Sequence, residues 1–146
     1  MMRKEEIDNI VVGLVESASS RNLGDILSEL NISLYRIDAS RPLLRGGYAC
    51  YIESPKRDTI YLSRDCPDEM RSFVIAHEIG HAVLHDVEIR HYGISKRGDK
   101  EEEEADYFAL RLLDPDWDMT EVEGYSSDEV ATMLGVSERC TKYLEF

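Results

Sequence analysis

Cysteine is scarce in this chain, and its placement excludes two classes of small protein. The three cysteines stand far apart, at positions 50, 66 and 140 of 146 residues, with no Cys-x-x-Cys pair and no zinc-knuckle spacing. An odd number of scattered cysteines indicates free thiols. We therefore expect neither a disulfide framework nor a cysteine-based metal site.

Long apolar runs are also missing. No segment approaches the roughly 20 apolar residues that a transmembrane helix needs. The apolar run at 10–15 is short, contains Gly13 and follows several acidic residues. It predicts an amphipathic helix rather than a signal peptide, so we expect a cytoplasmic protein that does not enter a membrane.

Positive charge is the third deficit. Lys and Arg number 17 against 30 Asp and Glu, which gives a net charge of −13. A surface this acidic repels phosphates and disfavours direct binding of nucleic acid. The segment 129–144 has the outline of a helix-turn-helix, but 121–146 hold six acids and two bases, whereas a recognition helix is basic.

What the chain does contain is the balance of a single folded domain, with 42% hydrophobic and 32% charged residues. Apolar periodicity and capping residues predict helices at 3–17, from Asn22 or Asp25 to about 30, at 68–84 and at 101–113. Two further short helices, hinged at Gly135, are expected in a C-terminal appendage at 126–146. Strands are expected at 33–38, 46–53 and 58–63, the last two forming a hairpin. These elements predict an α+β fold with a small, mostly antiparallel three-stranded sheet.

The segment 77–81, which reads His-Glu-Ile-Gly-His, has the pattern of a metal site. Two histidines four residues apart lie on one face of a helix, about 6 Å apart along its axis, so both imidazoles can reach one metal ion. Glu78 points elsewhere and can address a water at the metal. This arrangement predicts His77 and His81 as zinc ligands and Glu78 as the general base.

Spacing within the first helix leaves the third ligand open. His85 follows His81 by four residues, but three successive i+4 side chains do not converge easily on one ion. A histidine at a helix C-terminus, facing the dipole, is the more ordinary role for His85.

A carboxylate from the next helix is the other source of a third ligand. Glu102 begins the face that continues with Ala105, Asp106 and Ala109, and is therefore preferred. Glu101 and Glu104 stay open as alternatives, and Glu103 lies furthest round. Asp106, one turn after Glu102, can accept a hydrogen bond from His77 or His81 and fix its tautomer.

These residues resemble the ImmA/IrrE family of zinc metallopeptidases. The matching segments are AHEIGHAVLH at 76–85, EEEADYFALRLLDP at 102–115 and EVATMLGVSERCTKYL at 129–144. Residues 70–146 resemble the family well, while the first half matches only in the order of its elements. Asp106 stands where the family usually has Asn, and an Asp can accept the same hydrogen bond.

The resemblance implies a zincin-like metallopeptidase fold in one domain, 1–146, with zinc bound by His77, His81 and Glu102. Members of the family act in bacteria and their mobile elements, and several cleave helix-turn-helix repressors to release transcription. The implied function is therefore a zinc-dependent endopeptidase whose protein substrate is such a repressor. A peptide strand of the substrate would pair with the edge of the hairpin at 46–63.

One alternative is a non-proteolytic protein that keeps the zinc fold and sequesters a regulator or a toxin. Glu78 argues against it, because a purely structural site does not use a general base. His91, Tyr92 and Tyr125 are candidates for a further donor to the transition-state oxyanion, and the sequence does not choose among them. It also leaves the oligomeric state open.

Overall fold

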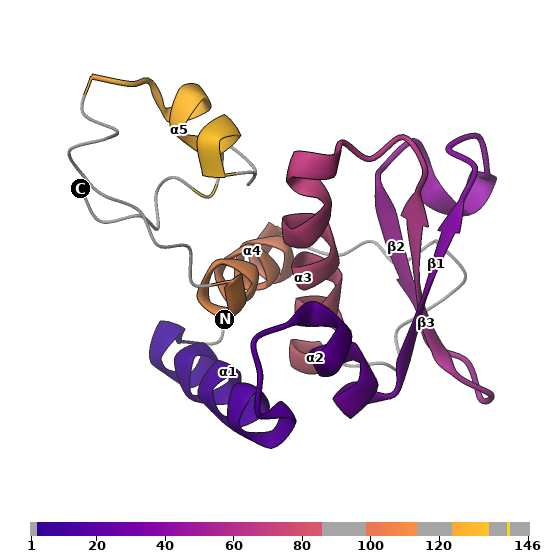
Figure 1. Cartoon of the computed structure of the whole chain (residues 1–146), viewed down its shortest axis with the longest axis horizontal. Helices are drawn as coiled ribbons and strands as arrows, with labels where there is room; N and C mark the ends of the chain where they lie inside the picture. Colours follow the sequence, from indigo (N-terminus) through magenta and orange to yellow (C-terminus); the bar gives the residue numbers. More distant parts are fainter. Residues whose placement is uncertain (1–2, 86–98, 114–123, 135–139, 141–146) are drawn as a thin grey trace.

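The structure, a computed structural model, describes residues 3–85, 99–113, 124–134 and 140. Its elements are, in chain order, α1 (Lys4–Ala18), α2 (Leu23–Leu30), β1 (Ile32–Ile37), η1 (Pro42–Leu44), β2 (Ala49–Ile52), β3 (Asp58–Ser63), α3 (Asp68–Leu84), α4 (Asp99–Leu113) and α5 (Ser127–Leu134). Helix α3 lies between the sheet and α4, with α1 and α2 at one end of the molecule (Figure 1). Within these ranges, no helix has both the length and the apolar character needed to cross a membrane.

The three strands form a mixed sheet, which corrects the prediction of a mostly antiparallel one. Their order is β1-β3-β2, with β1 parallel to β3 and β2 antiparallel to β3. The hairpin of β2 and β3 is confirmed. The segment between β1 and β2 contains η1 and leaves a gap of one strand between them. Strand β3 fills this gap and pairs with both earlier strands. Burial explains this order, because β3 has buried residues on both faces while most of β1 beyond Ile32 is at least partly exposed.

Helix α2 shows how local capping residues define the short elements. The Asn22 side chain accepts a hydrogen bond from the Asp25 amide and caps the N-terminus. Asn31 takes a left-handed conformation (φ 58°) at the C-terminus, where Asn is one of the few residues that does so at small cost. Between these two caps, Ile26 and Leu27 enter the core.

Helix α3 is the central element of the core. Asp68 and Glu69 occupy its first turn, where acids interact favourably with the helix dipole. Most of its second half is buried, and it packs on the sheet on one side and on α4 on the other. The core around it contains Ile7, Val11, Ile26, Leu27, Ile32, Tyr51, Ile60, Leu62, Phe73, Ile75, Ala76, Ile79, Phe108, Ala109, Leu110 and Leu112, among others.

Helices α3 and α4 approach closely at Gly80. A Cβ atom on Gly80 would meet Phe108 Cδ1 at 3.1 Å and the Cα of Ala105 at 3.2 Å. The predicted apolar face of α4 is confirmed, since Ala105, Phe108, Ala109 and Leu112 are fully buried. The absence of a side chain at Gly80 therefore brings the acidic start of α4 close to α3.

Helix α1 holds α4 from another side. The Asp8 carboxylate accepts a hydrogen bond from the Tyr107 hydroxyl (2.7 Å) and pairs with Arg111 Nε (3.0 Å). Arg21, just before α2, donates to the carbonyls of Arg111 and Leu112 at the end of α4. These contacts cap α4 and fix its position along α1.

The C-terminal appendage is described only in part. Helix α5 begins at Ser127, close to the predicted start, and its Val130 and Ala131 are buried. The predicted hinge at Gly135 and the second short helix lie outside the described residues, apart from Cys140. A division between domain and appendage therefore stays a prediction.

Candidate metal centre

Helix α3 presents three buried polar side chains in its second half. His77 is 8% exposed, Glu78 7% and His81 2%. Moving a polar group out of water costs free energy unless the group gains a hydrogen-bond or ion-pair partner. The arrangement of partners around these three side chains therefore determines what the site can do.

Glu102 from the second turn of α4 completes a cluster with the two histidines. Its two carboxylate oxygens lie 3.0 Å from His77 Nε2 and 3.1 Å from His81 Nε2, and the two Nε2 atoms are 3.1 Å apart. One ligand atom from each of these residues lies within 4.8 Å of the others. Two imidazoles and one carboxylate, brought together on two helices, can hold one metal ion.

Asp106 fixes the tautomer of His77. Its carboxylate lies 2.8 Å from His77 Nδ1 and is almost fully buried. A carboxylate only accepts hydrogen bonds, so Nδ1 of His77 must carry the proton. In the neutral ring, Nε2 then presents a lone pair toward Glu102 and His81. The role predicted for Asp106 as a hydrogen-bond acceptor is therefore met for His77.

Without a metal, a proton can take the place of the cation at His77. Burial disfavours the charged ring, but the hydrogen bonds to Asp106 and Glu102, together with the nearby charge of Glu78, raise the pKa of His77 to about 9. Burial on its own would raise the pKa of Glu102, because it disfavours the charged carboxylate. Hydrogen bonds from His77 and His81 outweigh this effect and hold the pKa of Glu102 well below its usual range. The electrostatics of the cluster favour a positive charge at its centre.

Sequence reasoning missed the surroundings of His85. This residue follows the last residue of α3, as expected for a helix C-terminus, but its ring does not face solvent. Its Nδ1 lies 2.9 Å from His81 Nδ1, and its Nε2 lies 3.2 Å from a carboxylate oxygen of Glu104. A signal was available, because Glu104 stands four residues before the buried Phe108 and shares its face of α4.

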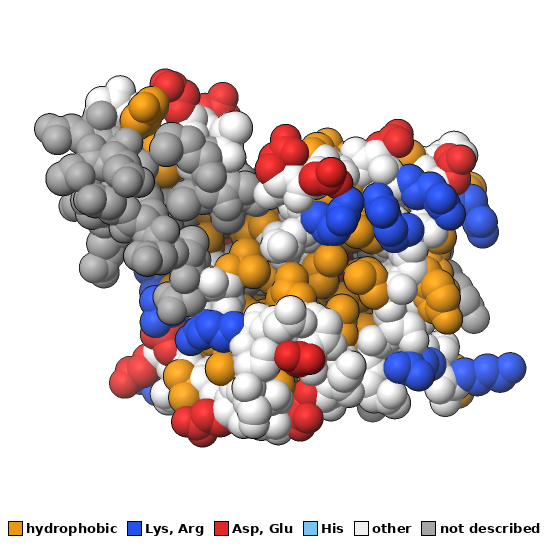
Figure 2. All heavy atoms as spheres, in the orientation of Figure 1, with side chains coloured by type: hydrophobic (Ala, Val, Ile, Leu, Met, Phe, Trp, Pro, Cys, Tyr) orange, Lys and Arg blue, Asp and Glu red, His pale blue; other side chains and the backbone are white. Residues whose placement is uncertain are grey.

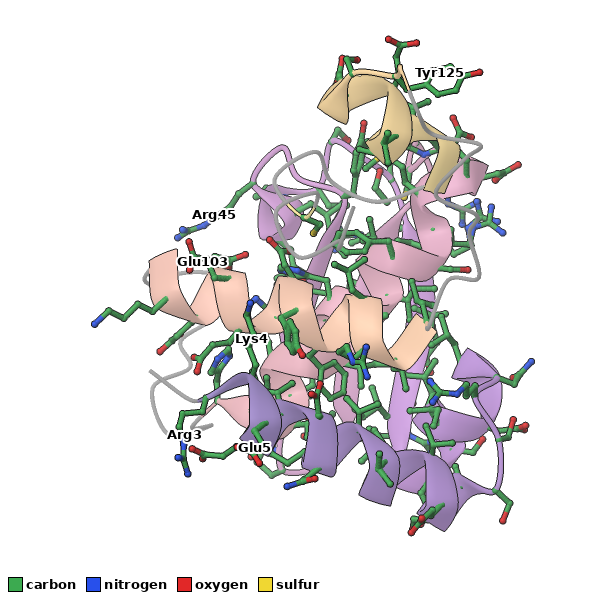
Figure 3. The ribbon with its side chains drawn as sticks, turned by 90° about the vertical axis from the view of Figure 1, so that its left-hand side faces the viewer. Arg3, Lys4, Glu5, Arg45, Glu103 and Tyr125 are labelled. Atoms are coloured by element: carbon green, nitrogen blue, oxygen red, sulfur yellow. The ribbon has the colours of Figure 1, made fainter. Side chains whose placement is uncertain are left out.

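The other candidates are placed as follows. Glu104, open as a third ligand, is buried beside His85 instead, and Glu101 and Glu103 are partly exposed. Tyr125 is 49% exposed, and Figure 3 shows it far from Glu103 of α4, so the structure does not bring it to the cluster. His91 and Tyr92 lie outside the described residues.

Comparison with known proteins identifies the family of the chain. Residues 30–143 match the family model of peptidase M78, described as the IrrE N-terminal-like domain. The chain belongs to the peptidase M78 family. The M78 match spans both α3 and α4, and so contains all four residues predicted to form the site, His77, Glu78, His81 and Glu102.

A phage protein is also similar to this M78 chain. The "uncharacterized immunity region protein 2" of Bacillus phage phi105 is 29% identical over 129 residues, which cover 84% of the chain and 78% of the relative. No solved structure matches the chain at a significant level.

Proposed function

We propose that the chain is a zinc-dependent endopeptidase whose ion is bound by His77, His81 and Glu102. One observation carries this proposal. Three ligand atoms, two imidazole Nε2 atoms and a carboxylate oxygen, converge at about hydrogen-bonding distance between α3 and α4. Because the Nδ1 proton of His77 is donated to Asp106, the cluster contains more hydrogen-bond acceptors than donors. A bound cation would interact with the lone pairs of these acceptors.

The proposed mechanism assigns the proton transfers to Glu78. A zinc ion held by these ligands would supply Lewis acidity for peptide hydrolysis. Glu78, buried next to His77 on α3, accepts a proton from the attacking water and returns it to the leaving amine. A site used only for structure would have no need of this buried carboxylate.

The proposed substrate is a helix-turn-helix repressor of a bacterium or a mobile element, cleaved in the cytoplasm. The phage relative supports this choice, because its name places it in an immunity region. The hairpin edge supports the binding mode. Strand β2 lies at an edge of the sheet and packs near α3, so an extended segment of the substrate can be added alongside it as a further strand.

The function is tested with Glu78→Gln and a repressor encoded beside this gene. The amide keeps the size of the side chain but cannot accept the proton, so cleavage should fall by about 10²–10⁴-fold while zinc content stays at one per chain. Cleavage is read by mass spectrometry after co-expression. Unchanged cleavage in Glu78→Gln would overturn the mechanism. Tight binding of an intact repressor by the zinc-loaded wild type would favour sequestration instead.

A further inference from the structure

The buried carboxylate of Glu104 lies behind the cluster, on the side of His81. The His85 side chain is 13% exposed and that of Glu104 is 8% exposed. They form a continuous chain of polar contacts from Glu104 Oε1 through His85 to His81 Nδ1, at 3.2 and 2.9 Å. Neither of these two contacts involves a ligand atom of the proposed metal site.

The directions of these hydrogen bonds follow from the carboxylate. Glu104 as a carboxylate only accepts, so Nε2 of His85 carries a proton and donates it. In neutral His85, Nδ1 is then an acceptor, and the proton between the two rings belongs to Nδ1 of His81. His81 is thereby held in the tautomer with a bare Nε2, the atom that lies 3.1 Å from Glu102.

We propose that Glu104 and His85 are positioning residues, which hold the His81 ring in the tautomer and orientation needed to bind the metal. This inference rests on the proposed metal site. It gives His81 the counterpart of the Asp106 contact on His77, with one difference. Asp106 reaches its histidine directly at 2.8 Å, whereas Glu104 acts through a second imidazole. Losing such a partner typically weakens metal affinity by about 10–100-fold.

The test measures zinc affinity by chelator competition in the full chain. His85→Leu and Glu104→Leu should each weaken zinc binding by about 10–100-fold. His85→Gln should keep a zinc affinity close to that of the wild type. Its amide NH₂ can donate to Glu104 and its amide oxygen can accept from His81, as the imidazole does. Glu103→Leu is the matched control, since it changes the neighbouring residue about 100° round the same helix, and it should leave the affinity unchanged.

A double variant separates positioning from general destabilisation. If Glu104 acts through His85, then Glu104→Leu should add little in the background of His85→Leu. The absorption spectrum of the Co²⁺-loaded protein provides a second readout, and should change in both leucine variants but not in Glu103→Leu. If His85→Leu does not fold, His85→Ala removes the same two bonds without adding bulk.

The outcomes distinguish this inference from the proposed function. Wild-type affinity in His85→Leu and Glu104→Leu, with zinc lost in His77→Ala and Glu102→Ala, would overturn the positioning role and leave the metal site standing. Equal weakening in Glu103→Leu and Glu104→Leu, or full additivity in the double variant, would also overturn it. Zinc retained in His77→Ala and Glu102→Ala would overturn the metal site itself.

Discussion

His77 shows how one side chain can carry either a proton or a ligand bond. Its Nδ1 proton is bound by Asp106, and its Nε2 atom is the one that faces Glu102. A metal ion must therefore displace the Nε2 proton, which the raised pKa of about 9 retains at neutral pH. Binding of metal and of this proton are competing events.

We expect zinc affinity to rise with pH by about tenfold per unit from near 7 until about 9, because one proton leaves per ion bound. Above that pH, His77 has no Nε2 proton to lose and the affinity should level off. Chelator competition across this range measures it, and a flat profile between pH 7 and 9 would contradict the assignment. Asp106→Asn keeps an acceptor but removes the charge, so it should move the levelling-off to lower pH.

The stability of the metal-free chain should show the opposite trend. A histidine whose pKa is raised on folding stabilises the folded state fully below its unfolded pKa near 6.5. This contribution is lost as the pH rises through about 9. The free energy of unfolding from urea titrations of the metal-free chain should therefore fall over this interval. In His77→Ala, this pH-dependent fall should be absent.

At the scale of elements, the contact between α3 and α4 decides whether the cluster forms. Gly80→Ala would place a methyl group against Phe108 and the backbone of Ala105. The gain in helix propensity, about 1 kcal/mol, is opposed by an overpacking cost of about 1–3 kcal/mol. Because backbone atoms cannot rotate away, the helices must separate, and Glu102 moves away from the histidines.

We therefore expect Gly80→Ala to lower the melting temperature and to weaken zinc binding together. Gly13→Ala in α1 is the matched control, since nothing lies within 4 Å of a Cβ added there. That variant should be neutral or more stable by up to about 1 kcal/mol. Zinc affinity unchanged in Gly80→Ala would show that the helix separation is not critical for the site.

Helix positions and the candidate site were accessible from sequence because their signals are local. Each signal lies within a few residues of the chain. They are the spacing of His77 and His81, the acids at the start of α3, and the caps of α2 at Asn22 and Asn31. Strand order was not accessible in this way. The pairing of β1 with β3 depends on which strand is buried on both faces, and alternation within Ile32–Ile37 contains no information about its neighbour.

The His85 contacts were missed for a related reason. From sequence, His85 has one ordinary explanation as a histidine at a helix end, and Glu104 is one of four consecutive glutamates. The spacing of Glu104 from Phe108 places it on the buried face of α4. Only the packing of α4 on α3 brings it to His85, and spacing within one helix does not predict that contact.

At the scale of the whole molecule, the negative charge is unevenly spread. Residues 32–64, which contain the sheet, hold six Lys or Arg and three Asp or Glu, a net of +3, so the rest of the chain carries −16. Figure 2 shows a row of Lys and Arg side chains over the sheet side of the face in view. A basic partner should therefore be attracted to the part of the chain outside residues 32–64.

We expect cleavage of a basic repressor to slow as salt rises, with kcat/KM falling and kcat nearly constant, because screening weakens long-range attraction. Neutralising exposed acids on α1, as in Glu5→Gln with Glu16→Gln, should reduce kcat/KM at low salt. The matched control is Arg36→Gln in β1 with Arg57→Gln between β2 and β3, and it should not reduce kcat/KM. A rate independent of salt would show that charge does not guide the encounter.

The close contact of α3 and α4 also has a consequence for the lifetime of the protein. His81 and Glu102 are 21 residues apart in the chain, and a metal ion bound by both would close that loop as a cross-link does. The described cysteines, Cys50, Cys66 and Cys140, form no disulfide, so a bound ion would cross-link the described part of the chain where no disulfide does. Unlike a disulfide, it would be insensitive to reductants and would depend on the supply of free metal. Metal starvation would then shorten the survival of the protein against cellular proteases, as well as stopping the proposed reaction.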